Sequence, residues 1–257
     1  MNGSASARRI AGVALGAALI AGACSSGQGS TAPSTTVAPA TTTARPTGGG
    51  APTRAELATV LPAATDLGEG WVETDAVDAA PSIDDGSPTD RAVADQCPAL
   101  AGLVGAETDE SADADHVVRR FVDGDGREVA VELDPSARMR TDADLQRAVD
   151  AANACEAVVV DDRDGVTSTL SFQAAVDPDH GEQAVKFQAR VELALPFEAD
   201  PISLNLYGMA FRTATVGVRI TASDGLDSES LGVNRTDVDL LASLSDRLEA
   251  SVDDLVG

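Results

Sequence analysis

The sequence predicts an α+β domain in which helices pack on one face of an antiparallel β-sheet, with one disulfide, preceded by a signal peptide and a disordered tether. Three observations carry this prediction. Several segments alternate apolar and polar residues, as strands with one buried face do. Other segments repeat apolar residues at helical spacing. Two of the three cysteines lie in the part of the chain that has these periodic patterns.

The first 23 residues have the features of a secretory signal peptide. Arg8 and Arg9 precede an uncharged apolar run at residues 10–22, shorter than the roughly 20 residues of a membrane-spanning helix. Three small residues then precede Cys24. This resembles the bacterial lipobox, although that motif favours Leu three positions before the cysteine, where this chain has alanine. The alternative is an ordinary secretory signal that happens to end near a cysteine.

The lipobox resemblance implies that the thiol of Cys24 carries a diacylglycerol and that cleavage makes Cys24 the first residue. Two or three acyl chains, such as palmitate, hold a protein stably at a membrane where a single chain does not. We therefore expect a lipoprotein anchored at Cys24 to the outer face of the cytoplasmic membrane, with the membrane as its first partner.

Residues 24–52 are predicted to be a tether. The stretch from Ser25 to Pro52 is rich in Ser, Thr, Pro, Gly and Ala and has almost no charge, a composition that cannot form a core. Periodic apolar patterns begin at residue 53, so residues 53–257 are predicted to form one α+β sensor-like or binding domain.

The charge of the chain excludes one class of function. The sequence has 42 acidic and 18 basic residues, and its formal net charge is −24 at pH 7. Such a surface repels the phosphates of nucleic acids, so a nucleic-acid partner is not expected. We interpret the acidity as a source of solubility rather than as a binding feature.

The first half of the domain begins with helices and continues with a hairpin. Thr53 and Glu56 form a Thr-x-x-Glu capping box, and Pro62 ends the helix that they start. Residues 90–105 predict a short helix. Residues 116–135 predict a hairpin of two β-prone runs joined by Asp-Gly-Asp-Gly.

The middle of the domain alternates one helix with strands. Residues 141–155 predict a helix that Thr141 caps, with an apolar stripe of Leu145, Ala148, Val149 and Ala152. Residues 156–176 predict two strands around a turn. The clearest strand is residues 184–195, where apolar residues at odd positions alternate with Lys, Gln, Arg and Glu.

The last part of the domain completes the sheet and adds a helix. Residues 202–208 and 209–223 predict further strands, with Val216, Val218 and Ile220 pointing inward. Residues 235–257 predict an amphipathic helix that docks on the apolar face of the sheet. Its stripe is Leu241, Leu244, Leu248, Val252 and Leu255.

Cys97 and Cys155 are predicted to form a disulfide. In an exported protein an even pair of cysteines indicates a bridge, once Cys24 is assigned to lipid. Each lies at the end of a predicted apolar helical segment. Neither is accompanied by His or acidic residues at metal-ligand spacing, so no metal and no cofactor are expected.

Two segments have a weak resemblance to chemical sites. His180 lies near Asp177, Asp179 and Glu182, which could form a metal corner or an acid–base pair, but we interpret the segment as an exposed hairpin turn. Residues 123–128 (DGDGRE) are similar to a calcium loop, yet the glycine and glutamate that an EF-hand requires are misplaced, so a hairpin turn is again preferred.

A few single residues remain. His116, the other histidine, starts a predicted strand and has no evident partner in the sequence. Trp71 and Tyr207 are each the only residue of their type, and we expect them at the edge of the core rather than in a ligand site. Asn234 to Thr236 matches a glycosylation sequon, which has little weight in a bacterial lipoprotein.

The domain resembles actinobacterial lipoproteins with a sensor-like domain, similar to the extracellular domain of a mycobacterial Ser/Thr protein kinase of the PknH type. The resemblance rests on residues 61–71 (LPAATDLGEGW), a middle helix with a cysteine, and residues 211–223 (FRTATVGVRITAS) before an amphipathic helix. In these places stand Arg212, Val216, Val218, Ile220, Leu241, Leu244 and Leu248. A second disulfide common in such domains is absent, because residues 221–225 contain no cysteine.

The resemblance implies an α+β domain that binds a ligand or senses a signal and has no catalytic residue. We therefore expect a non-enzymatic binding or sensor-like module with an unassigned small-molecule, cell-wall or protein ligand. Two alternatives stay open: a cell-envelope hydrolase that uses carboxylates, and a lipid or glycolipid carrier. A buried carboxylate pair in a cleft would favour the hydrolase, and a large dry cavity would favour the carrier.

Overall fold

The computed structural model describes residues 51–74, 88–99, 116–135, 142–161, 165–196, 198, 200–213, 215–227, 230 and 232–257. The predicted signal peptide, Cys24 and nearly all of the tether lie outside the described residues. Thr141, the predicted helix cap, and the second part of the helix predicted at residues 90–105 also lie outside them.

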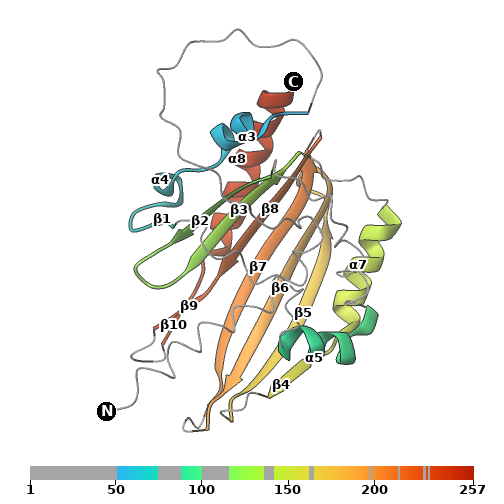
Figure 1. Ribbon diagram of the computed structural model, residues 1–257, viewed down its shortest axis with the longest axis vertical. Coiled ribbons are helices and arrows are strands. Elements are labelled where there is room, and N and C mark those ends of the chain that lie inside the picture. Colours follow the sequence, from blue (N-terminus) through green and yellow to red (C-terminus); the bar gives the residue numbers. More distant parts are fainter. Residues whose placement is uncertain are drawn as a thin grey trace, which may run out of the picture.

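An antiparallel sheet of eight strands forms the centre of the molecule (Figure 1). Its order is β1-β2-β3-β8-β7-β6-β5-β4, and β9 and β10 form a separate pair. The strands are β1 (Val72–Thr74), β2 (Val117–Val122), β3 (Glu128–Asp134), β4 (Val158–Asp161), β5 (Thr167–Asp177), β6 (Glu182–Ala194), β7 (Ile202–Thr213), β8 (Val216–Ser223), β9 (Gly225–Leu226) and β10 (Val233–Asn234). Most neighbours in the sheet are also neighbours along the chain, so hairpins build most of it.

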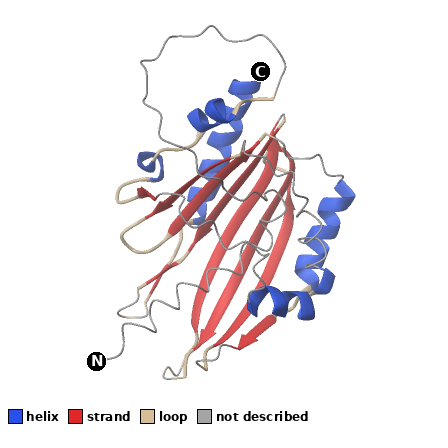
Figure 2. Ribbon diagram, in the orientation of Figure 1, coloured by secondary structure: helices blue, strands red, loops and turns tan. Residues whose placement is uncertain are grey.

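The helices fall into two groups, one beside β2, β3 and β8 and the other beside β4 and β5 (Figure 2). They are α3 (Arg54–Val60), α4 (Ala64–Leu67), α5 (Pro88–Gln96), α7 (Asp142–Ala154) and α8 (Val238–Val256). The predicted α+β class, the antiparallel sheet and the disulfide are confirmed. None of the described helices is long and apolar enough to cross a membrane.

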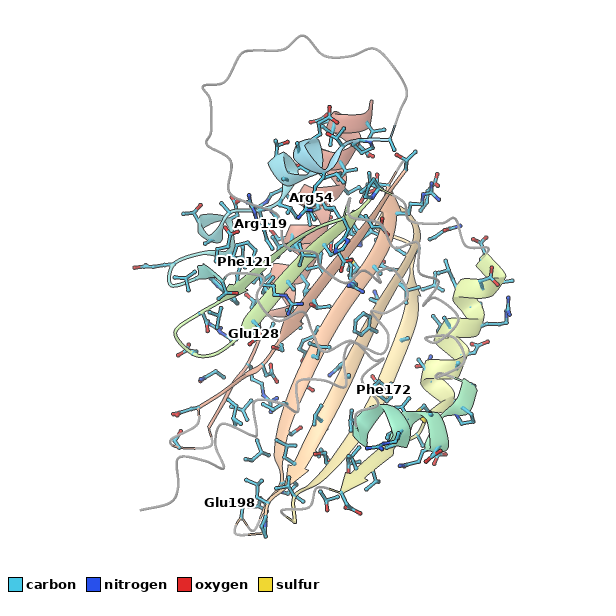
Figure 3. The ribbon with its side chains drawn as sticks, viewed as in Figure 1. Arg54, Arg119, Phe121, Glu128, Phe172 and Glu198 are labelled. Atoms are coloured by element: carbon cyan, nitrogen blue, oxygen red, sulfur yellow. A yellow bond between two sulfur atoms is a disulfide. The ribbon has the colours of Figure 1, made fainter. Side chains whose placement is uncertain are left out.

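The helices cover both faces of the sheet, which differs from the predicted packing on one face. One core joins α3, α4 and α8 to β2, β3, β8 and the end of β7. A second core joins α5 and α7 to β4, β5, β6 and the start of β7. Figure 3 shows Phe121 on β2 at one end and Phe172 beside α5 at the other.

The apolar pattern of β7 explains why the cores lie on opposite faces. Ile202 is buried in the second core, whereas Met209 and Phe211 are buried in the first. Because side chains alternate between the two faces of a strand, even and odd positions point to opposite faces. The apolar positions thus change from even to odd along β7. The prediction assumed that one face stays apolar across the whole sheet.

Gly208 lies where this change occurs. Its partner in the neighbouring strand is Phe187, whose ring lies over the glycine. A Cβ atom at position 208 would be 2.0 Å from the Cζ atom of Phe187, which no real side chain tolerates. The absence of a side chain therefore allows the aromatic ring to cover the middle of β7.

Local sequence signals explain α3 and α8, two of the three helices at the first core. Glu56 donates its backbone N–H to the hydroxyl of Thr53 and accepts from the backbone N–H of Thr53, which confirms the predicted capping box. The side chain of Asp237 caps α8 by accepting from the backbone N–H of Asp239. Four residues of the predicted α8 stripe are buried, Leu241, Leu244, Leu248 and Val252, and Leu255 is half-buried.

Candidate functional site

The disulfide joins the ends of two helices in the second core. Cys97 directly follows α5 and Cys155 directly follows α7, and both are buried. Their α-carbons are 5.6 Å apart and their sulfur atoms are bonded. The predicted pairing is confirmed.

His180 lies in the turn between β5 and β6, as predicted, but its side chain is not exposed. It is 8% exposed, and Asp177 is 4% exposed. Its Nδ1 atom is 3.1 Å from Oδ2 of Asp177, and its Nε2 atom is 3.2 Å from Oδ1 of Asp246 on α8. The backbone N–H of Gly181 also donates to Glu249 of α8 at 2.9 Å. The polar side chains of this turn therefore contact α8 rather than solvent alone.

The charges around His180 favour an ionised Asp177. Burial raises the pKa of Asp177, but hydrogen bonds from the backbone N–H of Asp179 and from His180, with the positive charge of Lys186, leave that pKa below its ordinary value. The Nζ atom of Lys186 is 3.9 Å from Asp177. An ionised carboxylate only accepts hydrogen bonds, so Nδ1 of His180 is the donor in its contact with Asp177.

This His180 cluster, defined as Asp177, His180, Lys186 and Asp246, has the residue types of an acid–base site. The contacts of its histidine, however, are made within the protein: one nitrogen faces the hairpin and the other faces α8. Asp177 also accepts from the backbone N–H of Asp179. The cluster therefore joins two elements, and a reacting group would have to displace one of these contacts.

A second polar group lies on β3 and β8, on the face of the sheet opposite α8. Glu132 of β3 and Arg219 of β8 are cross-strand partners and form an ion pair. Their position follows from the alternation of side chains, since Val131 and Ile220 point into the first core. By the same alternation Arg120 of β2 and Thr221 of β8 share this face. We call these four residues the Glu132 patch.

One oxygen of the Glu132 patch has no hydrogen-bond donor. Glu132 is 6% exposed, and its Oε2 atom accepts from Arg219. Its Oε1 atom is buried and accepts no hydrogen bond. Buried polar atoms without a partner are uncommon, because each one costs about 1–3 kcal/mol of desolvation. The arrangement can accept a hydrogen bond from a hydroxyl or an amine, while Arg120 and Thr221 beside it offer donors.

Sequence reasoning missed the Glu132 patch. Glu132 and Arg219 stand at the polar positions of alternating strands, where exposed side chains are expected. Their pairing follows from the contact of β3 with β8, across 87 residues of chain. A useful signal was the opposite charge of these two residues, each on the polar side of a predicted strand.

A third polar group is saturated with contacts inside the protein. The buried carboxylate of Asp224 accepts from the backbone N–H and the side-chain amide of Asn205, at 2.8 and 2.9 Å. It also accepts from Arg235 at 2.6 Å and from the backbone N–H of Thr236 at 2.8 Å. Burial, and then the charge of Asp224, raise the pKa of Tyr207 nearby. This group fixes the segment before α8 to β7.

The DGDGRE segment forms the predicted turn between β2 and β3. Oδ1 of Asp123 accepts from the backbone N–H groups of Asp125 and Arg127, both at 2.9 Å, and Oδ2 accepts from the Arg127 guanidinium at 2.6 Å. The carboxylate is thus used by the turn itself. No group of three or more metal-ligating residues occurs among the residues that the structure describes.

The other single residues noted in the sequence are half-buried or hydrogen-bonded within the protein. Trp71 and Tyr207 are half-buried against the first core, as predicted, and the guanidinium carbon of Arg127 is 5.9 Å from the centre of the Trp71 ring. Asn234 of the sequon donates its amide to the carbonyl oxygen of Asp125 at 2.9 Å. His116 is half-buried directly before β2.

Comparison with known proteins gives a distant structural resemblance. No family model matches the chain, and no curated protein matches its sequence. Among solved structures, the extracellular domain of PknH from Mycobacterium tuberculosis matches with a TM-score of 0.43 and 10% sequence identity. The match covers 80% of this chain and 100% of that chain. It is a distant resemblance in structure and carries no argument about activity.

Proposed function

We propose that this protein is an extracytoplasmic lipoprotein whose folded part binds a polar ligand at the Glu132 patch and does not transform it. The observation that carries the proposal is the buried Oε1 atom of Glu132, which accepts no hydrogen bond. A ligand hydroxyl or amine would supply the missing donor. The same ligand would need acceptors for Arg120, Arg219 or Thr221.

The location rests on two features of the chain. The basic start, the short apolar run and the small residues before Cys24 favour export followed by lipid attachment. The Cys97–Cys155 bridge fits an oxidising space, because structural disulfides persist in exported proteins and are rare in the cytosol. The tether would place the domain away from the membrane surface.

A carboxylate hydrolase is the second candidate, since His180 lies between Asp177 and Asp246. We prefer binding because Asp177 and both ring nitrogens of His180 already have partners inside the protein. The Glu132 patch instead has an unused acceptor. A lipid carrier would require a large apolar cavity, and the Glu132 patch, with its two arginines and one glutamate, has the opposite chemistry.

The binding proposal is tested by mass spectrometry of small molecules that copurify with the native protein. We expect a polar molecule on the wild type that is lost from Glu132→Gln, because the amide turns one acceptor into a donor. The matched control is Glu128→Gln, on the same strand and the same face but exposed. Equal retention by the wild type and both variants would contradict binding at this patch. Turnover of a copurified molecule that disappears in His180→Gln would favour the hydrolase.

The anchor is tested separately. Cys24→Ala should move the protein from the detergent phase to the aqueous phase or leave it unprocessed, because the acyl chains have no other attachment site in the proposal. Partitioning of the variant equal to that of the wild type would contradict lipid attachment at Cys24, whatever the outcome of the binding experiment.

A further inference from the structure

Arg120 of the Glu132 patch has an unused guanidinium. Its side chain is half-buried on β2, on the face of the sheet that also carries Glu132. Within the part of the chain that the structure describes, this guanidinium forms no ion pair and donates no hydrogen bond. Arg219 differs, because it is paired with Glu132. The patch therefore holds an unused donor as well as an unused acceptor, the buried Oε1 atom of Glu132.

The unused donor and the unused acceptor are near each other but are not in contact. Arg120 is the cross-strand partner of Ala130, and Glu132 lies two residues further along β3 on the same face. Such diagonal neighbours have β-carbons about 7–8 Å apart. Since Arg120 forms no ion pair with Glu132, one small molecule can contact both side chains.

Small residues form the surface of the sheet beside these two groups. Ala130 of β3 and Thr221 of β8 are cross-strand partners, and Gly208 of β7 is the next partner in the same row. Ala130 and Thr221 are both half-buried, and none of the three has a side chain larger than that of threonine. The row ends at Phe187 of β6, whose ring lies over Gly208. A small molecule above Ala130 would thus have Arg120 on one side and an apolar ring beyond Thr221.

The charge of the whole molecule limits which small molecule fits. A formal net charge of −24 repels a simple anion, although the guanidinium of Arg120 alone would favour one. A simple cation would satisfy Glu132 and leave Arg120 without an acceptor. A molecule that carries both charges has no net charge to be repelled. Both of its hydrogen bonds would also be charge-assisted, which makes each roughly twice as strong as a bond between neutral groups.

We propose that the Glu132 patch binds a small zwitterion of the α-amino-acid class, whose ammonium donates to Oε1 of Glu132 and whose carboxylate accepts from the guanidinium of Arg120. This inference rests on the proposed function, because it specifies the ligand of the same site. A planar guanidinium suits a carboxylate, since two parallel N–H groups can bind its two oxygens. Arg219 remains on Oε2 of Glu132, so Oε1 is left for the ligand.

Calorimetry on the full protein, after removal of copurified small molecules, tests this ligand class. The probes are L-alanine, D-alanine, L-leucine and L-glutamate, each with its N-acetyl form, which lacks the ammonium, and its α-amide, which lacks the α-carboxylate. We expect at least one amino acid to bind. Both of its derivatives should bind about tenfold to a hundredfold more weakly, since each loses a hydrogen bond to a charged group. Absence of binding by all four amino acids would overturn the zwitterionic ligand.

Two substitutions assign the two ends of the ligand. Glu132→Gln should abolish the preference for the amino acid over its N-acetyl form and keep the preference over its amide. Arg120→Gln should do the reverse. The matched controls are Glu128→Gln and Arg91→Gln, which change exposed residues and should bind as the wild type does. A variant that loses both preferences together would indicate a general change in the site and would overturn the assignment of the ends.

Failure of this inference and failure of the binding proposal give different results. A copurified polar molecule that is lost from Glu132→Gln but has no ammonium or no carboxylate would overturn the zwitterion and leave binding at the patch intact. An amino acid bound equally by the wild type, Glu132→Gln and Arg120→Gln would overturn both, because its site would then lie elsewhere.

Discussion

Asp177 is the residue on which the β5–β6 turn depends. Its carboxylate accepts from the backbone N–H of Asp179 at 3.1 Å and lies 3.1 Å from His180, which in turn contacts Asp246 of α8. One of the contacts between the hairpin and the last helix therefore depends on a buried acid. Its ionisation should be visible in the stability of the whole protein.

We expect Asp177→Asn to lower the free energy of unfolding at pH 7 by about 1.5–3 kcal/mol, the range for hydrogen bonds to a charged group. The pKa of Asp177 is below its ordinary value of 3.8, so its contribution is present above that value and is lost as the pH falls through the lowered pKa. Urea unfolding at pH 7, 5 and 3 measures this. The difference between variant and wild type should shrink at the lowest pH, and exposed Asp179→Asn is the control for the loss of charge. A difference that stays constant with pH would contradict the prediction.

Gly208 is a second residue at which the structure predicts a clear effect of substitution on stability. Gly208→Ala should destabilise the protein by about 1–3 kcal/mol, because the new Cβ atom would overlap the ring of Phe187. Phe187→Leu removes that ring, so the double variant should cost less than the sum of the two single changes. Thermal unfolding of the four proteins measures the coupling. Gly124→Ala is the control, since a Cβ atom there meets nothing within 4 Å. Simple additivity at Gly208 and Phe187 would show that the contact is not the cause.

Single-residue burial was predictable where its cause is local and was missed where its cause is distant. The caps of α3 and the stripe of α8 depend on residues within a few positions of one another, which a sequence displays directly. The burial of the β5–β6 turn depends on α8, which lies 68 residues further along at the Gly181–Glu249 contact. No local sequence pattern indicates a contact between segments this far apart in the chain.

The elements α5 and α7 form a unit through their disulfide. The bridge closes a span of 58 residues that contains the whole β2–β3 hairpin. The chain-entropy relation gives a loop of this length about 4 kcal/mol of stabilisation, compared with a typical total of about 5–15 kcal/mol. The bridge should therefore supply a large part of the free energy of unfolding.

Cys155→Ser should accordingly lower the melting temperature by many degrees. A reducing agent should lower that of the wild type by a similar amount and leave the variant unchanged. Calorimetry with and without the reductant measures both. A wild type that melts at the same temperature under reducing conditions would contradict a stabilising bridge.

The strands were predictable as elements, but the faces that they bury were not. Alternation identified β5, β6 and β8 and the direction of their apolar residues. It did not reveal that β7 changes its apolar face at Gly208, because half of a twelve-residue strand offers only three positions on each face. The prediction that all helices pack on one face assumed that each strand keeps its apolar residues on the same face along its whole length.

Acidity is a property of the whole molecule, and it should limit the stability of the fold. A formal net charge of −24 makes the compact state repel itself, and dissolved ions screen that repulsion. We expect the melting temperature to rise by a few degrees between about 0.05 and about 0.5 M sodium chloride. Thermal scans across that range measure the effect. A melting temperature that falls with salt would show that the ion pairs, such as Glu132 with Arg219, outweigh the general repulsion.

The placement of two cores on opposite faces has a consequence for how this chain can vary. Behind each core the other face of the sheet carries mostly polar side chains, so substitutions there remove few apolar side chains from the interior. A protein with one continuous core has fewer such positions. The residues on these two surfaces can therefore change independently of each other. Proteins with this fold could then differ in what they bind while they keep the same interior.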